Sequence, residues 1–160
     1  MTLIELNRLP DTRAEAELMR CCASHRWVHL MTAERPFGNF QVLTAVAQRL
    51  WWSLAAADWL EAFAAHPRIG ERATSTWSAQ EQARAMETGD DAVARLTVGN
   101  RAYEKRFGYT FIVCATDKSA EEILSILEQR LLNEPADELQ IAADEQRKIT
   151  ELRLNKLITT

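Results

Sequence analysis

A histidine followed at once by a proline is the first candidate for chemistry in this sequence. His66 and Pro67 belong to the stretch FAAHPRIGER at residues 63–72, where alanines and a phenylalanine bring an expected helix to its end. The proline ring restricts the backbone on both sides, so we expect His66 on a stiff loop. An imidazole titrates near neutrality and can act as a general acid or polarise a bond. The alternative is a structural histidine that caps the last carbonyls of that helix.

A serine and a glutamate three residues apart are the second candidates. Ser78 and Glu81 open the stretch SAQEQ at an expected helix start. Ser-x-x-Glu is also the capping-box pattern, which satisfies two otherwise unpaired amides and needs no catalysis to justify it. Ser119 and Glu122 repeat the spacing at another expected helix start. Spacing alone therefore does not separate a binding role from a capping role.

An arginine in the last expected helix is the third candidate. One face of that helix is formed by Leu139, Ala142, Gln146, Ile149, Leu152, Lys156 and Leu157. At about 100° per residue, Arg153 points along the middle of this face. A guanidinium there must be paired. Either an internal carboxylate holds it, or it reaches into a cavity and binds an anionic ligand through its planar fork.

A metal site is not expected. Cys21, His25 and His29 follow at four-residue steps and would share a face only on one continuous helix. The segment between Arg20 and Ser24 is an expected helix break, and no fourth ligand is suggested nearby. We therefore predict no bound metal.

The lysines and glycines do not indicate a cofactor either. A Schiff-base lysine needs a desolvated amine, and only one lysine falls on an apolar face of an expected helix. The four lysines are Lys105, Lys118, Lys148 and Lys156, of which Lys156 is the one on that face. No glycine-rich phosphate cradle is present. We expect a reaction without a cofactor.

The remaining sequence predicts the helices that position these residues. Asp11 can cap a first helix, and further helices are expected over residues 24–34, 39–54, 58–65, 78–87, 91–107, 119–133 and 135–158. Gly108 is placed to stop the helix that ends at Phe107. The stretch YTFIVCAT at 109–116 is apolar and β-branched but has no partner strand, so we expect an extended buried segment. The prediction is an all-α fold, a single-domain helical bundle over residues 1–160.

Composition and charge exclude several classes of protein. Of the 160 residues, 47% are hydrophobic and 26% charged, which is typical of one compact helical domain. The net charge of −4 argues against nucleic acid as a partner. The sequence has no long apolar run, no signal-peptide pattern and no address in its final KLITT, so we expect a cytoplasmic protein without membrane contact. Cysteines at 21, 22 and 114 form no disulfide framework.

Several motifs in order carry a resemblance to a known family. They are RPF at 35–37, HPRIG at 66–70, WSAQEQ at 77–82, NRAYEKRFGYTFIVCA at 100–115 and ELRLNKL at 151–157. Together they resemble the 2-oxo-4-hydroxy-4-carboxy-5-ureidoimidazoline (OHCU) decarboxylases of urate breakdown, over most of the chain. The resemblance implies an all-α carboxy-lyase without a cofactor, usually a homodimer. It also implies that the anionic substrate OHCU is converted to (S)-allantoin, the last step from urate to allantoin in purine catabolism.

The resemblance also implies roles for individual residues. His66 matches the family's catalytic histidine, Pro67 its neighbour, and Arg153 an arginine expected to fix the anionic substrate. The helix start expected to contact the substrate ring and ureido group comprises Ser78, Ala79, Gln80, Glu81 and Gln82. The segment whose main chain is expected to line the site comprises Phe111, Ile112, Val113, Cys114 and Ala115. One departure follows it: the chain has Thr116-Asp117-Lys118 where many relatives carry a glycine and a basic residue.

The implied reaction asks little covalent chemistry of the protein. The OHCU carboxylate lies on a carbon next to a ring imine, so carbon dioxide can leave with its electrons flowing into the C=N bond. The protein must bind the anion, align the breaking bond and protonate one face of the intermediate. His66 would assist charge movement or deliver a proton, and Glu81 would orient a ureido N–H or hold the His66 tautomer. OHCU also decays unaided to racemic allantoin, so product handedness is the signature of catalysis.

Two other interpretations stay open. In the first, the chain is a catalytically silent helical binding module in which His66 caps a helix, Ser78 and Glu81 form an ordinary capping box, and Arg153 pairs internally. In the second, the chain is a relative that acts on a different ureido or imidazoline acid. That enzyme would keep His66 and Arg153 while changing the pocket.

Overall fold

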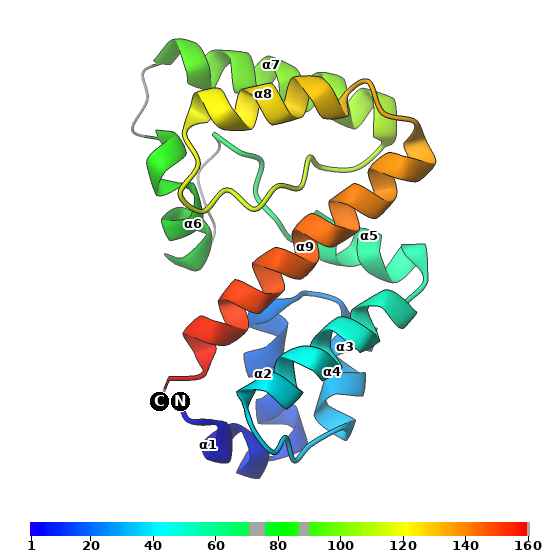
Figure 1. Cartoon of the computed structure of the whole chain (residues 1–160), viewed down its shortest axis with the longest axis vertical. Coiled ribbons are helices and arrows are strands. Elements are labelled where there is room, and N and C mark those ends of the chain that lie inside the picture. The colour runs from blue at the N-terminus through cyan, green and yellow to red at the C-terminus, as the bar shows by residue number, and fades with distance from the viewer. Residues whose placement is uncertain (71–75, 87–89, 160) are drawn as a thin grey trace. The chain divides into compact units, whose positions relative to one another are not determined.

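The all-α prediction is confirmed by the computed structural model, which describes residues 1–70, 76–86 and 90–159. Within these residues the chain forms nine α-helices and no strand (Figure 1). Their bounds are α1 Leu3–Arg8, α2 Asp11–Cys21, α3 His25–Ala33, α4 Phe40–Ser53, α5 Ala56–Ala64, α6 Thr76–Met86, α7 Asp90–Phe107, α8 Ala120–Arg130 and α9 Pro135–Leu157. Contacts divide the chain into unit 1, residues 1–62 and 146–160, and unit 2, residues 63–145.

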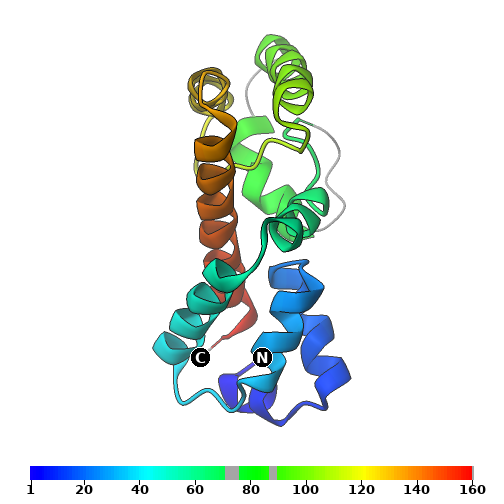
Figure 2. The same cartoon turned by 90° about the vertical axis from the view of Figure 1, so that its right-hand side faces the viewer.

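Unit 1 contains α1 to α4, most of α5 and the second half of α9. Two of its helices begin where the sequence predicts a helix start, and both starts are capped. The Ser24 hydroxyl accepts a hydrogen bond from the Trp27 N–H at 3.3 Å, and the Asn39 side chain accepts one from the Val42 N–H at 2.9 Å. Helices α2 and α3 pack side by side (Figures 1 and 2). The caps therefore set where α3 and α4 start, and apolar packing holds the helices together.

The start of the chain differs from the prediction. An additional helix, α1, precedes Asp11 and begins with a capping box in which the Glu5 N–H donates to the Thr2 hydroxyl at 3.2 Å. Asp11 is the first residue of α2 and caps nothing, because Pro10 occupies the cap position. Its carboxylate instead pairs with the Arg35 guanidinium at 2.7 Å.

The buried face of α9 is turned relative to the predicted face. Leu152 is 36% exposed and Lys156 is exposed, whereas Leu154 is fully buried. Leu152 and Leu154 lie on opposite sides of Arg153 around the helix. The spacing of apolar residues therefore does not decide which of these two sides is buried. Arg153 is 9% exposed, which confirms its predicted burial.

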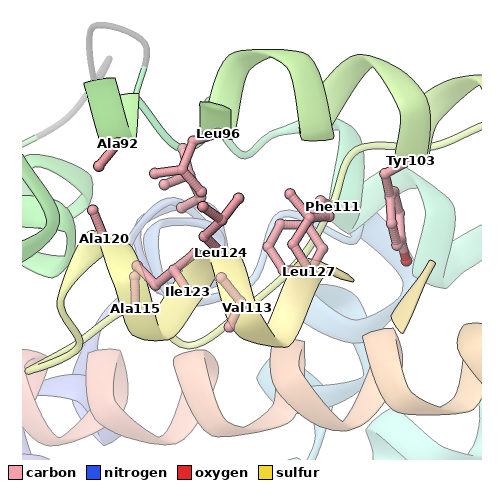
Figure 3. Close-up of a cluster of buried hydrophobic side chains, with 11 residues drawn as sticks. Ala92, Leu96, Tyr103, Phe111, Val113, Ala115, Ala120, Ile123, Leu124 and Leu127 are labelled. Atoms are coloured by element: carbon pink, nitrogen blue, oxygen red, sulfur yellow. The ribbon is translucent and has the colours of Figure 1, made fainter. Parts of the chain in front are cut away.

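Unit 2 is built around the packing of α7 against α8. Gly99 lets the two helices approach closely, because a Cβ at this position would overlap the side chain of Leu127. Gly108 has a φ of +83° and ends α7, as predicted, with its N–H donating to the Glu104 carbonyl at 2.8 Å. The core between these helices also receives side chains from the chain that follows Gly108 (Figure 3).

Of the predicted extended buried segment 109–116, residues 111–115 are extended and buried, whereas Tyr109, Thr110 and Thr116 are half-buried. Phe111, Val113 and Ala115 belong to the hydrophobic core of α7 and α8, whereas the intervening Ile112 and Cys114 do not (Figure 3). This alternation is the period of two of an extended chain. All five residues are at most 7% exposed. We refer to residues 111–115 as the extended segment.

Candidate functional site

The loop that carries His66 is bound to α7 at two consecutive residues, Arg68 and Ile69. Helix α5 ends at Ala64, and the His66 N–H donates to the Phe63 carbonyl at 3.1 Å. The Arg68 guanidinium binds both carboxylate oxygens of Glu104, at 2.5 and 3.1 Å. The Asn100 side-chain amide donates to the Ile69 carbonyl at 2.9 Å. The loop therefore holds the half-buried His66 on a backbone that α7 supports on one side.

Helix α6 presents a row of buried polar side chains. Ser78, Glu81 and Gln82 are 5%, 9% and 5% exposed, whereas Ala79 and Gln80 are exposed. The Gln82 side-chain oxygen accepts a hydrogen bond from the Gly70 N–H at 3.3 Å, which joins α6 to the loop that carries His66. Three of the five residues predicted on this helix are thus on its buried face.

The capping-box interpretation of Ser78 is wrong. Helix α6 begins at Thr76, so Ser78 lies inside its first turn rather than before it. Ser119, with the same spacing to a glutamate, is a true cap whose hydroxyl accepts from the Glu122 N–H at 3.2 Å. The predicted end of α6 near Glu87 falls outside the described residues. The position of Ser78 inside the helix therefore excludes it as the cap of α6.

The Glu81 carboxylate lies near the extended segment. Burial raises the pKa of the Cys114 thiol, and the negative charges of Glu145 and Glu81 raise that pKa further, against the lowering effect of Lys118. The charge of Glu81 therefore acts on a thiol of the extended segment. Unit 2 therefore brings together the loop of His66, the buried face of α6 and the extended segment.

The main chain of the extended segment is bound by charged side chains along one edge. The Arg130 guanidinium donates to the Ile112 carbonyl at 2.5 Å. The Cys114 N–H donates to the Glu145 carboxylate at 3.2 Å, and the Lys118 ammonium donates to the Cys114 carbonyl at 2.7 Å. We call Arg130, Glu145 and Lys118 the main-chain clamp.

The peptide groups of Val113 are different. In the part of the chain that the structure describes, neither its N–H nor its C=O forms a hydrogen bond, although Val113 is only 4% exposed. Buried main-chain donors and acceptors are almost always paired, so the Val113 N–H and C=O can both bind a ligand. A cyclic amide or a ureide offers an N–H and a C=O side by side and fits this requirement.

The clamp residues are functional candidates that the sequence interpretation missed. A signal for Arg130 exists, because it continues the buried positions Ile123 and Leu127 at helical spacing. Glu145 and Lys118 have no comparable signal. Their role depends on chain segments that meet only in the fold.

Arg153 belongs to unit 1. Its guanidinium donates to the Arg20 carbonyl at 3.5 Å. Burial raises the pKa values of the Cys21 and Cys22 thiols to about 12, and the positive charge of Arg153 opposes this rise. The guanidinium therefore lies close to both buried thiols. Whether it also binds an anionic ligand stays a prediction.

The three residues weighed as metal ligands do not share a face. Cys21 ends α2, and His25 begins α3. The exposed imidazoles of His25 and His29 instead lie 3.3 Å from Glu61 and 3.5 Å from Glu15. Across residues 1–70, 76–86 and 90–159, no helix has the length and apolar character needed to cross a membrane.

Comparison with known proteins decides the family. The family model described as OHCU decarboxylase matches residues 7–155. The chain belongs to the OHCU decarboxylase family. It is 38% identical over 133 residues to the 2-oxo-4-hydroxy-4-carboxy-5-ureidoimidazoline decarboxylase of Amia calva, covering 78% of this chain and 75% of that protein.

Two further comparisons extend the likeness. The chain is 37% identical over 154 residues to the uric acid degradation bifunctional protein TTL of Arabidopsis thaliana, covering 91% of this chain and 47% of that protein. It thus spans about half the length of the Arabidopsis relative. A crystal structure of an OHCU decarboxylase in the presence of (S)-allantoin superposes with a TM-score of 0.83 at 38% identity, covering 90% of this chain and 98% of that one.

Proposed function

We propose that this chain is a carboxy-lyase that decarboxylates OHCU to (S)-allantoin, the last step from urate to allantoin in purine catabolism. Membership of the OHCU decarboxylase family supports this proposal. The structural observation that carries it is the buried Val113 peptide without a hydrogen bond in the described chain, next to the Cys114 thiol that Glu81 influences. OHCU is a cyclic ureide with a ureido substituent and fits a site of this kind.

The proposed binding mode follows from the polarity of the groups in unit 2. The Val113 N–H would donate to a carbonyl of the substrate, and the Val113 carbonyl would accept from a neighbouring N–H. The buried carboxylate of Glu81 would accept from a ureido N–H, with Ser78 and Gln82 on the same face of α6. Arg153 would contribute attraction for the anion. These contacts would fix which face of the ring meets the proton donor.

The proposed reaction consumes one proton. The bond between the hydroxyl-bearing carbon and the carboxylate breaks, carbon dioxide leaves, and the electron pair passes into the ring C=N bond. The imine nitrogen takes up a proton. A proton then adds to one face of the former imine carbon, while the hydroxyl group loses its proton and its carbon becomes a carbonyl. His66 would move a proton in one of these steps, because an imidazole can do so at neutral pH. The substrate is its own electron sink, so the protein contributes binding, alignment and proton transfer.

We further propose that the enzyme needs no cofactor, acts in the cytoplasm and forms a homodimer. The electron sink within the substrate supports the first point, and the likeness to the family supports the last. Dialysis against a chelator should leave turnover unchanged, and analytical ultracentrifugation should give twice the mass of the 160-residue chain. Loss of turnover on dialysis or a monomer mass would contradict the respective point.

The experiment that tests the function generates OHCU in place with urate oxidase and hydroxyisourate hydrolase. Carbon dioxide release and the handedness of allantoin are then followed with and without the protein. We expect faster release and a product that is predominantly (S)-allantoin. Racemic allantoin formed at the spontaneous rate would refute the proposed activity.

A further inference from the structure

The main-chain clamp binds only one of the two edges of the extended segment. In an extended chain, the N–H and C=O groups of one residue point to one edge, and those of the next residue point to the other. The clamp holds the Ile112 carbonyl and both main-chain groups of Cys114. Val113 lies between these residues, so its N–H and C=O point to the opposite edge.

We propose that Arg130, Glu145 and Lys118 are positioning residues, which fix the extended segment so that the Val113 peptide faces the ligand. This inference rests on the proposed function and goes beyond it, because it assigns a role to three residues that do not themselves touch the substrate. With no strand among the described residues, the clamp supplies the hydrogen bonds that a neighbouring strand would otherwise make. Charged side chains thereby bind the main-chain groups on one edge of the extended segment, and the main-chain groups on its other edge can bind a small molecule.

The burial of Arg130 supports a positioning role. Arg130 and Glu138 are 5% and 0% exposed, and the Arg130 Nε lies 2.5 Å from the Glu138 carboxylate. The Tyr103 hydroxyl also donates to that carboxylate, at 2.9 Å. A buried ion pair is seldom the most stable filling for a core, since an apolar replacement is often as stable or more so. The ion pair does fix the Nε side of the guanidinium, while Nη1 of the same group donates to the Ile112 carbonyl.

The contacts of Glu145 and Lys118 allow a direct test. Both side chains are half-buried, and both bind the main chain of the same residue, Cys114. Glu145→Gln keeps a side-chain oxygen that can accept from the Cys114 N–H, whereas Glu145→Met removes it at nearly the same volume. Comparing the two variants separates the hydrogen bond from the charge and from the packing.

Each variant should be assayed for kcat, KM, allantoin handedness and amide hydrogen exchange across residues 111–115. We expect Glu145→Met to raise KM about tenfold or more, to lower the (S) excess and to speed exchange of the Cys114 amide, since a lost hydrogen bond of about 1.4 kcal/mol is tenfold in binding. Glu145→Gln should keep KM, the (S) excess and the exchange rate of the Cys114 amide close to their wild-type values. Loss of activity in both variants with unchanged exchange would overturn the positioning role, because the charge itself would then be required.

A second variant covers Arg130. Replacing only Arg130 would leave the buried Glu138 without its partner, so we choose the double variant Arg130→Met, Glu138→Leu. The double variant should fold, as judged by circular dichroism. Its allantoin product should lose its (S) excess, and its KM should rise as in Glu145→Met. Leu6→Ala, in the core of unit 1, is the control for general loss of stability and should keep the wild-type KM and handedness below its melting temperature.

The outcomes separate this inference from the proposed function. A wild-type protein that forms only racemic allantoin at the spontaneous rate would refute the function. Hydrogen exchange would then still report whether the clamp orders the segment. Wild-type kinetics and handedness in both Glu145→Met and the double variant would refute the positioning role and leave the function standing.

Discussion

Two serines with the same spacing to a glutamate should respond oppositely to the same substitution. Ser119 caps α8, and its hydroxyl accepts from the Glu122 N–H at 3.2 Å on the exposed surface. Ser119→Ala removes one cap and should cost about 1 kcal/mol of unfolding free energy. For a chain of this length, that loss lowers Tm by roughly 2–4 °C. Activity at 25 °C should be unchanged, because the folded population stays close to complete.

Ser78 should show the reverse pattern. It is 5% exposed and lies inside the first turn of α6, where alanine is a better helix former by roughly 0.5 kcal/mol. The gain in propensity offsets part of the lost hydrogen bonding, so Tm should change little. A lost hydrogen bond to the substrate should lower kcat/KM roughly 10- to 100-fold. Thermal unfolding and kinetics of both variants test this together, and a Ser78→Ala variant with full activity and a lowered Tm would refute the reasoning.

Three further predictions concern other parts of the chain. Gly108→Ala should lower the unfolding free energy by about 1–2 kcal/mol in urea titrations, because its φ of +83° strains any L side chain; an unchanged midpoint would contradict this. Arg153→Met should raise KM at least tenfold and Arg153→Lys less, and a wild-type KM in Arg153→Met would exclude its role in binding the anion. Burial raises the pKa of Cys22 to about 12 from 9.0, so the unfolded chain releases this proton first. The unfolding free energy should therefore fall above pH 9 by up to about 1.4 kcal/mol per pH unit, and Cys22→Ala should flatten that profile.

Much of the fold could be predicted because local signals and the final structure agree. Ser24, Asn39, Ser119 and Gly108 mark helix ends in the sequence and do so in the structure. Helix α1 was missed although Thr2 and Glu5 have the capping-box spacing, because a six-residue helix has too few apolar positions to show periodicity. The burial of Arg153 was predicted correctly, yet Leu152 and Lys156 are exposed. Which flank of α9 is covered is decided by its neighbours in space and not by its own spacing.

The candidate site could be predicted only in part. The residue types at His66, Ser78 and Glu81 suggest polar chemistry, and the structure places Ser78 and Glu81 on one buried face of α6. Spacing did not separate Ser78 from the true cap Ser119, because the difference lies in where each helix begins. The main-chain clamp was not predicted at all. It consists of side chains from α8, α9 and a loop that bind peptide groups. Peptide groups are the same at every position, so the sequence does not show which of them a side chain binds.

We propose that His66 acts on OHCU and that its loss changes the handedness of the product. The most direct measurement is the circular dichroism of allantoin formed from OHCU generated in place, compared between the wild-type chain and a His66→Asn variant of equal Tm. We expect a rapid (S)-allantoin signal for the wild type, and slow racemic product for the variant. An equal (S)-allantoin signal from both proteins would contradict it and leave His66 as a residue that only closes α5.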